Sequence, residues 1–311
     1  MGTEFIMEVL PKSYFYSKNI IKNMLMLICP NLIIRIKRPT GTGNQHIDSD
    51  LEASINYSRD VFQKYLYFLT VKDFASFLHG KTVCEFGPGD TVTVALLFLA
   101  YGASRVICFD RFPLVQDKQK NTLIAKRLLE ILPEAQKAYL QKVISFDDRG
   151  YVTWDGSRLC YLYNKNEALE IEAETVDLLV SNAVLEHVFN LKGLFREMSR
   201  TMKPGAVMVH AADLGPHQLS FNTPLDFLTI PEWRWKLMTS HRGAPNRARK
   251  SHYERLLAKY GFDILKFEVT EHFTQTDIDM IATRVPLLRE TMSMDDLFCK
   301  SMLFSARKLE N

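Results

Sequence analysis

Two acids and two glycines have the types and spacing that could bind a nucleoside. Glu85, Gly87 and Gly89 follow one apolar run, and Asp110 ends the next. Glycines in a turn adopt positive φ and let backbone N–H groups approach a ligand, while an acid closing the following strand accepts both hydroxyls of a ribose. The sequence therefore predicts a nucleoside site built from a strand, a glycine turn, a helix over residues 91–101 and a second strand.

The same turn disfavours a pyrophosphate. The dinucleotide fingerprint places a third glycine at the start of the helix, and Val92 stands at that position. Glu85 would also face the phosphates in a poorly solvated crevice, whereas it would attract a ligand ammonium group. A nicotinamide dinucleotide is therefore the less favoured ligand.

A second pattern continues the alternation of strands and helices. Residues 175–182 form an apolar run that leads into Leu185-Glu186-His187-Val188, and Lys203-Pro204-Gly205 precedes another run over 206–210. A Pro-Gly pair marks a turn, and short apolar runs between turn signals indicate buried strands. The remaining predicted strands cover residues 159–163, 264–269 and 302–306.

In order and spacing, these segments resemble the motifs of the class I S-adenosylmethionine-dependent methyltransferases. The resemblance implies S-adenosyl-L-methionine as cofactor, with Glu85 near the amino group of its methionine part and Asp110 at its ribose. It also implies contacts from strand ends and from the helix that precedes the first strand. The predicted cofactor-binding residues are Tyr57, Glu85, Gly87, Pro88, Gly89, Asp110, Arg111, Asn164, Asn166, Ser181 and Asn182.

The resemblance further implies an α/β fold. We expect a Rossmann-like, seven-stranded, mostly parallel sheet with helices on both faces and an antiparallel edge strand. A helical extension is expected over residues 1–50, where one interpretation of 1–6 is a cloning remnant, ahead of a methyltransferase domain over 51–311. Within that domain we expect a helical insertion over 116–143 and a substrate-side insertion over 213–250.

Three residues at the end of the fifth predicted strand are candidates for proton transfer. Histidine titrates near neutral pH and a neighbouring carboxylate orients its ring, so His210, Asp213 and His217 are the predicted catalytic residues. The same residue types also ligate divalent metals, and a purely structural role is a third alternative; we predict no metal. Glu186 lies at a helix start, where a carboxylate is favourable without any catalytic role.

Residues 224–253 combine aromatic and arginine side chains, which suit a sugar face and an anionic group. They resemble an insertion in methyltransferases encoded with surface-polysaccharide and lipid biosynthesis genes. The predicted acceptor-binding residues are His187, Trp233, Arg242 and Arg247. The alternative is a solvated basic loop whose aromatic side chains anchor it to the core.

The predicted function is methyl transfer to a hydroxyl or amine of a small-molecule, sugar or lipid-linked acceptor. The alternatives are an RNA methyltransferase and a non-catalytic protein that binds S-adenosylmethionine. A formal net charge of +3 is small for 311 residues, so a nucleic-acid partner is not expected.

Five cysteines without a C-x-x-C pair predict buried thiols and a cytoplasmic location. Residues 12–38 mix apolar and basic side chains. For this segment we expect a helix packed on the domain, with peripheral membrane contact as the alternative. The sequence leaves the oligomeric state open.

Overall fold

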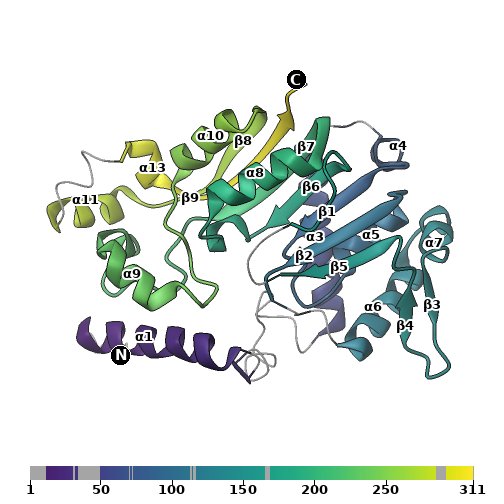
Figure 1. Cartoon of the computed structure of the whole chain (residues 1–311), viewed down its shortest axis with the longest axis horizontal. Coiled ribbons are helices and arrows are strands. Elements are labelled where there is room, and N and C mark those ends of the chain that lie inside the picture. Colours follow the sequence, from purple (N-terminus) through teal and green to yellow (C-terminus); the bar gives the residue numbers. More distant parts are fainter. Residues whose placement is uncertain are drawn as a thin grey trace, which may run out of the picture.

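The computed structural model of the protein describes residues 12–30, 32–33, 50–69, 71, 73–112, 114, 117–164, 169–284 and 292–310. Its centre is a seven-stranded sheet in the order β5-β2-β1-β6-β7-β9-β8 (Figure 1). The strands are β1 (Thr82–Phe86), β2 (Arg105–Asp110), β5 (Leu159–Tyr163), β6 (Val176–Asn182), β7 (Met202–Asp213), β8 (Phe262–His272) and β9 (Cys299–Lys308). A separate hairpin consists of β3 (Ile144–Phe146) and β4 (Val152–Trp154).

Strand directions confirm the predicted fold. β5, β2, β1, β6 and β7 pair in parallel, while β9 is antiparallel to β7 and to its outer neighbour β8. β2 and β5 follow β1 in the sequence and lie on one side of it. β6 lies on the other side of β1, so the direction in which strands are added reverses there. In an open α/β sheet, ligands bind at the carboxyl ends of the strands beside such a reversal. The ends of β1 and β6 are therefore where the fold itself predicts a site.

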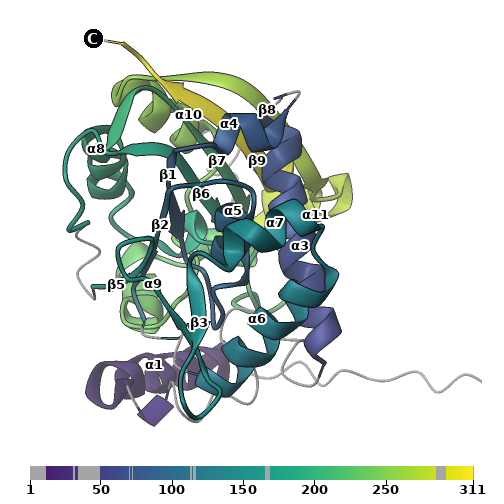
Figure 2. The same ribbon diagram turned by 90° about the vertical axis from the view of Figure 1, so that its right-hand side faces the viewer.

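Helices cover both faces of the sheet (Figures 1 and 2). One face packs against α3 (Leu51–Leu69), α5 (Thr93–Ala100), α6 (Lys118–Ile131) and α7 (Glu134–Leu140), and the other against α8 (Leu191–Thr201) and α10 (Lys250–Lys259). The short α4 (Phe74–Leu78) precedes β1. The inner parallel strands β2, β1 and β6 are covered on both sides and are almost entirely buried, which explains their apolar runs in the sequence. Pro133 separates α6 from α7, because proline cannot donate the hydrogen bond that would continue the helix.

A third apolar cluster forms around the segment that follows β7. η3 (Asp226–Thr229) and α9 (Glu232–Thr239) pack with α11 (Gln275–Arg284) and α13 (Met294–Phe298). α1 (Lys12–Ile28) lies against α9 (Figure 1). Asn23 on α1 donates to the carbonyl of Leu237 at 2.9 Å and accepts from the N–H of His241 at 2.8 Å. The N-terminal helix is thus held by these hydrogen bonds and by Phe15, Tyr16 and Ile20, which pack against the third cluster.

A buried arginine joins the third cluster to the sheet. Arg249 is 4% exposed, and its guanidinium donates to the carbonyls of Leu214, Asp296 and Cys299. These carbonyls belong to the loop after β7, to α13 and to the first residue of β9. One side chain therefore connects three segments that are far apart in the sequence.

We expect Arg249→Ala to lower the free energy of unfolding by about 3 kcal/mol, because three buried carbonyls lose their donor. Urea denaturation measures the change. The control is Arg255→Ala, an exposed residue of α10, the helix that Arg249 precedes, for which we expect a change within about 0.5 kcal/mol. Equal unfolding midpoints for the two variants would contradict the bridging role of Arg249.

Candidate active site

The turn after β1 has the backbone shape that the sequence predicts. Gly87 and Gly89 have φ values of 65° and 77°, in the left-handed region that side chains other than glycine rarely adopt. The N–H of Gly87 donates to the carbonyl of Phe109 at 2.8 Å, which ties the turn to β2. A Cβ at position 87 would lie 2.4 Å from Cγ2 of Val184, in the loop after β6. Glycine is therefore required here both for its φ and for the close approach of this loop.

Glu85 is a buried acid beside this turn. It is 3% exposed, and burial raises the pKa of its carboxyl to about 8. The Cys108 thiol donates to its Oε2 at 3.8 Å, and this hydrogen bond lowers the pKa of Glu85, whereas the neighbouring Asp110 raises it. An acid in this state gains most from a ligand that brings a positive charge. The site therefore fits the ammonium group of S-adenosylmethionine.

Asp110 ends β2 as predicted. Burial raises its pKa to about 7, and the backbone N–H groups of Phe112 and Arg111 act in the opposite direction. Its Oδ1 accepts the Phe112 N–H at 2.9 Å. Hydroxyl donors from a ribose would supply further hydrogen bonds that favour the ionised form.

Two further predicted cofactor residues contact each other at the same end of the sheet. Asn182, the last residue of β6, donates through Nδ2 to the Tyr57 hydroxyl on α3 at 3.0 Å. Its Oδ1 accepts from Lys64 Nζ at 3.3 Å. α3 thus contacts the strand end that lies beside the glycine turn.

The remaining described candidates for cofactor binding follow the carboxyl ends of β1, β2 and β5. The N–H of Asn164 donates to the carbonyl of Asp110 at 3.2 Å, and the Arg111 guanidinium lies 5.5 Å from the centre of the Phe112 ring. Pro88 is half-buried within the turn. Asn166 lies outside the described residues. A Cβ built on Gly243 would lie 3.9 Å from Phe112, so the segment after β7 reaches the loop that follows Asp110.

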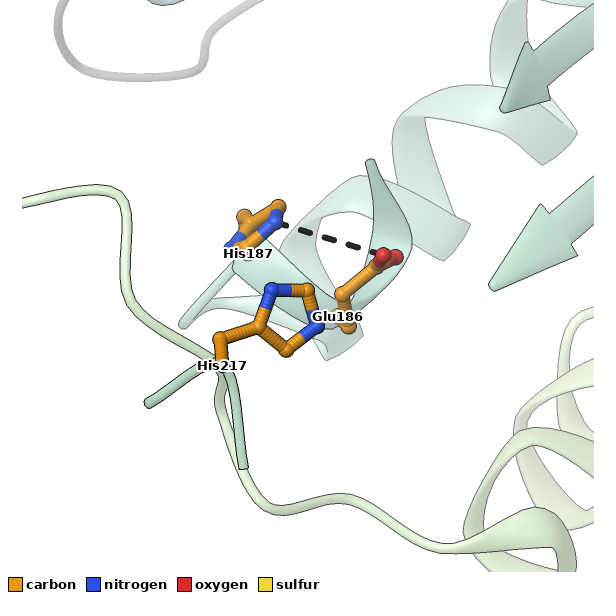
Figure 3. A group of neighbouring side chains, drawn as sticks. All are labelled: Glu186, His187 and His217. Carbon is orange, nitrogen blue, oxygen red and sulfur yellow. Dashed lines mark ion pairs between the residues drawn. The ribbon is translucent and has the colours of Figure 1, made fainter. Parts of the chain in front are cut away.

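Glu186, His187 and His217 form a compact group beyond the ends of β6 and β7 (Figure 3). The first two belong to η2 (Leu185–His187), and one ligand-type atom from each of the three residues lies within 4.8 Å of the others. The imidazole rings of His187 and His217 meet edge to face at 4.9 Å. Burial, followed by the neighbouring His217, lowers the pKa of His187 to about 4.

Glu186 is the buried member of this group. It is 1% exposed, and burial raises its pKa to about 8. Its Oε1 accepts the N–H of Asp213 at 3.2 Å, while its Oε2 has no hydrogen-bond partner among the described residues. Glu186 thereby fixes the point where the chain leaves β7.

His217 and Asp213 are brought together as the sequence predicts. His217 Nε2 lies 3.1 Å from the Asp213 carbonyl and 3.6 Å from its Oδ2. The His217 side chain is 26% exposed. Its φ of 46°, with 65° at Gln218, is a strained conformation that sets the direction of the ring.

The prediction that His210 lies together with Asp213 and His217 is wrong. His210 is fully buried, its Nδ1 is hydrogen-bonded to Ser181 Oγ at 2.6 Å, and burial lowers its pKa to about 3. Side chains alternate along a strand, so His210 and Asp213 point to opposite faces of the sheet. The same hydrogen bond engages the hydroxyl of Ser181, which is also fully buried; cofactor contact by Ser181 stays a prediction.

Two predicted acceptor-binding arginines are occupied by structural contacts. Arg242 donates to Asn19 Oδ1 on α1 at 2.8 Å. Arg247 pairs with Glu232, donates to two backbone carbonyls and lies 4.9 Å over the Trp235 ring. These contacts stabilise the segment after β7, and substrate binding by either guanidinium stays a prediction. Trp233 is 60% exposed on α9 and stays a candidate.

Sequence reasoning missed the residue that holds η2 in place. Asn246 donates through Nδ2 to the carbonyls of Leu185 and Val188 at 2.8 and 2.7 Å, and its N–H donates to the carbonyl of Glu186 at 2.6 Å. An asparagine in a loop gives no sequence signal that separates this role from ordinary turn formation.

Comparison with known proteins agrees with this geometry. The sequence profile of the family described as "Methyltransferase domain" matches residues 57–266, more than half of the chain. The chain therefore belongs to this family. Together with the sheet order and the acid-glycine turn, this makes it a class I S-adenosylmethionine-dependent methyltransferase. A search of curated protein sequences gave no match.

Similar solved structures include two methyltransferases. An S-adenosylmethionine-dependent methyltransferase from Mesorhizobium loti is 16% identical, with 81% of this chain and 100% of that chain covered and a TM-score of 0.44. Phosphoethanolamine N-methyltransferase 2 from Haemonchus contortus, in complex with S-adenosylmethionine, is also 16% identical. In that pair 82% of this chain and 53% of that chain are covered, and the TM-score is 0.44.

Asp110→Ala should weaken S-adenosylmethionine binding by about 1 to 3 kcal/mol, because the charge-assisted bonds to the ribose are lost. Calorimetric titration measures the affinity. Asp177→Ala, which removes an ion pair with Lys203 on neighbouring strands, is a control that leaves the site intact. Unchanged affinity in Asp110→Ala would remove the ribose assignment.

The raised carboxyl pKa values predict a pH effect on the ligand-free protein. A folded-state pKa above the unfolded value means that the folded state binds more protons, so stability falls as pH rises between the two. For Glu85 this window runs from its ordinary value of 4.5 to about 8. We expect the stability loss between pH 5.5 and 8.5 to be smaller in Glu85→Gln than in the wild type, measured by urea denaturation. Parallel pH profiles would show that Glu85 is not the titrating group.

Proposed function

We propose that this methyltransferase acts on a hydroxyl or amine of a small-molecule, sugar or lipid-linked acceptor, with His217 as base and Asp213 as its orienting partner. The observation that carries the proposal is the partly exposed His217 ring held beside Asp213. This pair lies beyond the end of β7, while Val184, two residues before Glu186, contacts the glycine turn. The base candidate and the cofactor turn thus share one end of the sheet.

The chemistry needs positioning and the removal of one proton. Bound S-adenosylmethionine would supply a methyl group on a positively charged sulfur. The acceptor oxygen or nitrogen would attack the methyl carbon in line, the carbon–sulfur bond would break and S-adenosylhomocysteine would leave. When the Nε2–H of His217 donates to the Asp213 carbonyl, Nδ1 carries a lone pair. This lone pair can take the proton from the hydroxyl or amine that is methylated. The Asp213 carboxylate stabilises the resulting imidazolium.

Acceptor recognition rests on fewer residues than the sequence predicts. With Arg242 and Arg247 committed to the fold, the exposed Trp233 and the imidazole of His187 are the proposed acceptor contacts. An aromatic face suits the C–H side of a sugar ring. Because Arg242 and Arg247 already have partners within the fold, fewer cationic groups are left for phosphates, which also argues against an RNA substrate.

A cytoplasmic location is part of the proposal. All five cysteines are free thiols, and Cys84, Cys108 and Cys299 are buried. Burial raises the pKa of the Cys84 and Cys299 thiols, which keeps them unreactive. Unpaired thiols are typical of a reducing compartment.

Label transfer from methyl-tritiated S-adenosylmethionine tests the acceptor class. We expect label in hydroxyl- or amine-bearing small molecules, sugars or lipid extracts. Label in RNA alone would favour the RNA alternative. A protein that binds the cofactor and labels none of these acceptors would match the non-catalytic alternative.

With a labelled acceptor in hand, His217→Asn should lower kcat roughly a hundredfold while cofactor affinity stays unchanged. His272→Asn, an exposed histidine of β8, is the matched control and should retain full activity. Full activity in His217→Asn would exclude it as the base. If instead a chelator abolished wild-type activity and a divalent ion restored it, the Glu186-His187-His217 group would be a metal site.

A further inference from the structure

α1 packs on the third cluster through Phe15, Tyr16 and Ile20, and its outer side also exposes large apolar residues. Asn19 and Asn23 are only 5% and 2% exposed, and both make hydrogen bonds to the segment around α9. The solvent-facing side of a helix on a water-soluble domain is normally polar. Four of the exposed apolar residues of α1 form what we call the outer stripe, and they are between 44% and 68% exposed: Tyr14, Ile21, Leu25 and Ile28.

The outer stripe is a single continuous line. Its members are separated by 7, 4 and 3 residues, which at ~100° per residue places all four within an arc of about 60°. Figures 1 and 2 both show α1 on the outside of the molecule, beneath α9.

Charge along α1 indicates what the stripe contacts. Lys18 and Lys22 are exposed and lie on the helix beside the stripe, and α1 contains three lysines and no acid. Apolar side chains with flanking lysines are the pattern of a helix that lies in an anionic bilayer surface. No described helix of the chain meets the length and apolarity needed to cross a membrane.

We propose that α1 lies flat on an anionic membrane, with the outer stripe among the lipid chains and Lys18 and Lys22 against the lipid phosphates. Asn19 and Asn23 keep the opposite side of the helix on the protein. Because α1 packs on α9, which carries Trp233, membrane contact would bring the proposed acceptor side close to the lipid. The membrane contact itself does not depend on which acceptor the enzyme methylates.

Vesicle co-sedimentation of the full chain tests this surface. The probes are vesicles of phosphatidylcholine alone and of phosphatidylcholine with about 30 mol% phosphatidylglycerol. We expect the wild type to sediment only with the anionic vesicles. The double variant Ile21→Asp/Ile28→Asp should lower the bound fraction about tenfold, as should Lys18→Glu/Lys22→Glu. The matched control is Leu123→Asp, a similarly exposed leucine at 46% on α6, which should bind as the wild type does.

Calorimetric titration with S-adenosylmethionine shows whether each variant is folded, so a loss of vesicle binding is read only from variants that bind the cofactor normally. A wild type that stays in the supernatant with both vesicles would overturn the proposal, as would equal loss of binding in Leu123→Asp. Equal sedimentation with neutral vesicles would overturn the anionic assignment. Light scattering that shows a dimer converted to monomer by Ile21→Asp/Ile28→Asp, without vesicle binding, would assign the stripe to a second copy of the chain.

Discussion

The contact between Gly87 and Val184 is the constraint on which the site depends. The turn after β1 approaches the loop after β6 so closely that a Cβ at position 87 would lie 2.4 Å from the valine side chain. This approach sets the start of η2, and with it Glu186 and His187. Glu186 in turn receives the N–H of Asp213 at the end of β7. Cofactor turn and proposed base are thereby positioned by one chain of short contacts.

Three arginines hold the segment after β7 in place. Arg249 connects it to the last strand and to α13, Arg247 stabilises it internally, and Arg242 joins it to α1. Basic residues that look like a binding surface in the sequence therefore act mainly as hydrogen-bond donors to buried carbonyls and amides, where a guanidinium can satisfy several acceptors at once.

Local sequence signals were sufficient for the sheet and the cofactor turn, because apolar runs, a glycine turn and strand-end acids each depend on neighbouring residues. Contacts between distant segments were not predictable in the same way. The sequence suggested that His210 was accessible to a substrate. Its buried position instead follows from the pairing of β6 with β7, which places His210 beside Ser181. The orientation of α1 was equally hard to predict, since apolar residues occur on more than one side of the helix and Asn19 and Asn23 are buried beside Phe15, Tyr16 and Ile20.

Calorimetric titration of the wild-type protein with S-adenosylmethionine, S-adenosylhomocysteine and NADH tests the central claim most directly. The buried acids Glu85 and Asp110, and Val92 in place of a third glycine, predict binding of both sulfur nucleosides at micromolar concentrations, on the order of −8 kcal/mol, and none of NADH. Binding of NADH without either sulfur nucleoside would contradict the assignment of the glycine turn and with it the proposed chemistry.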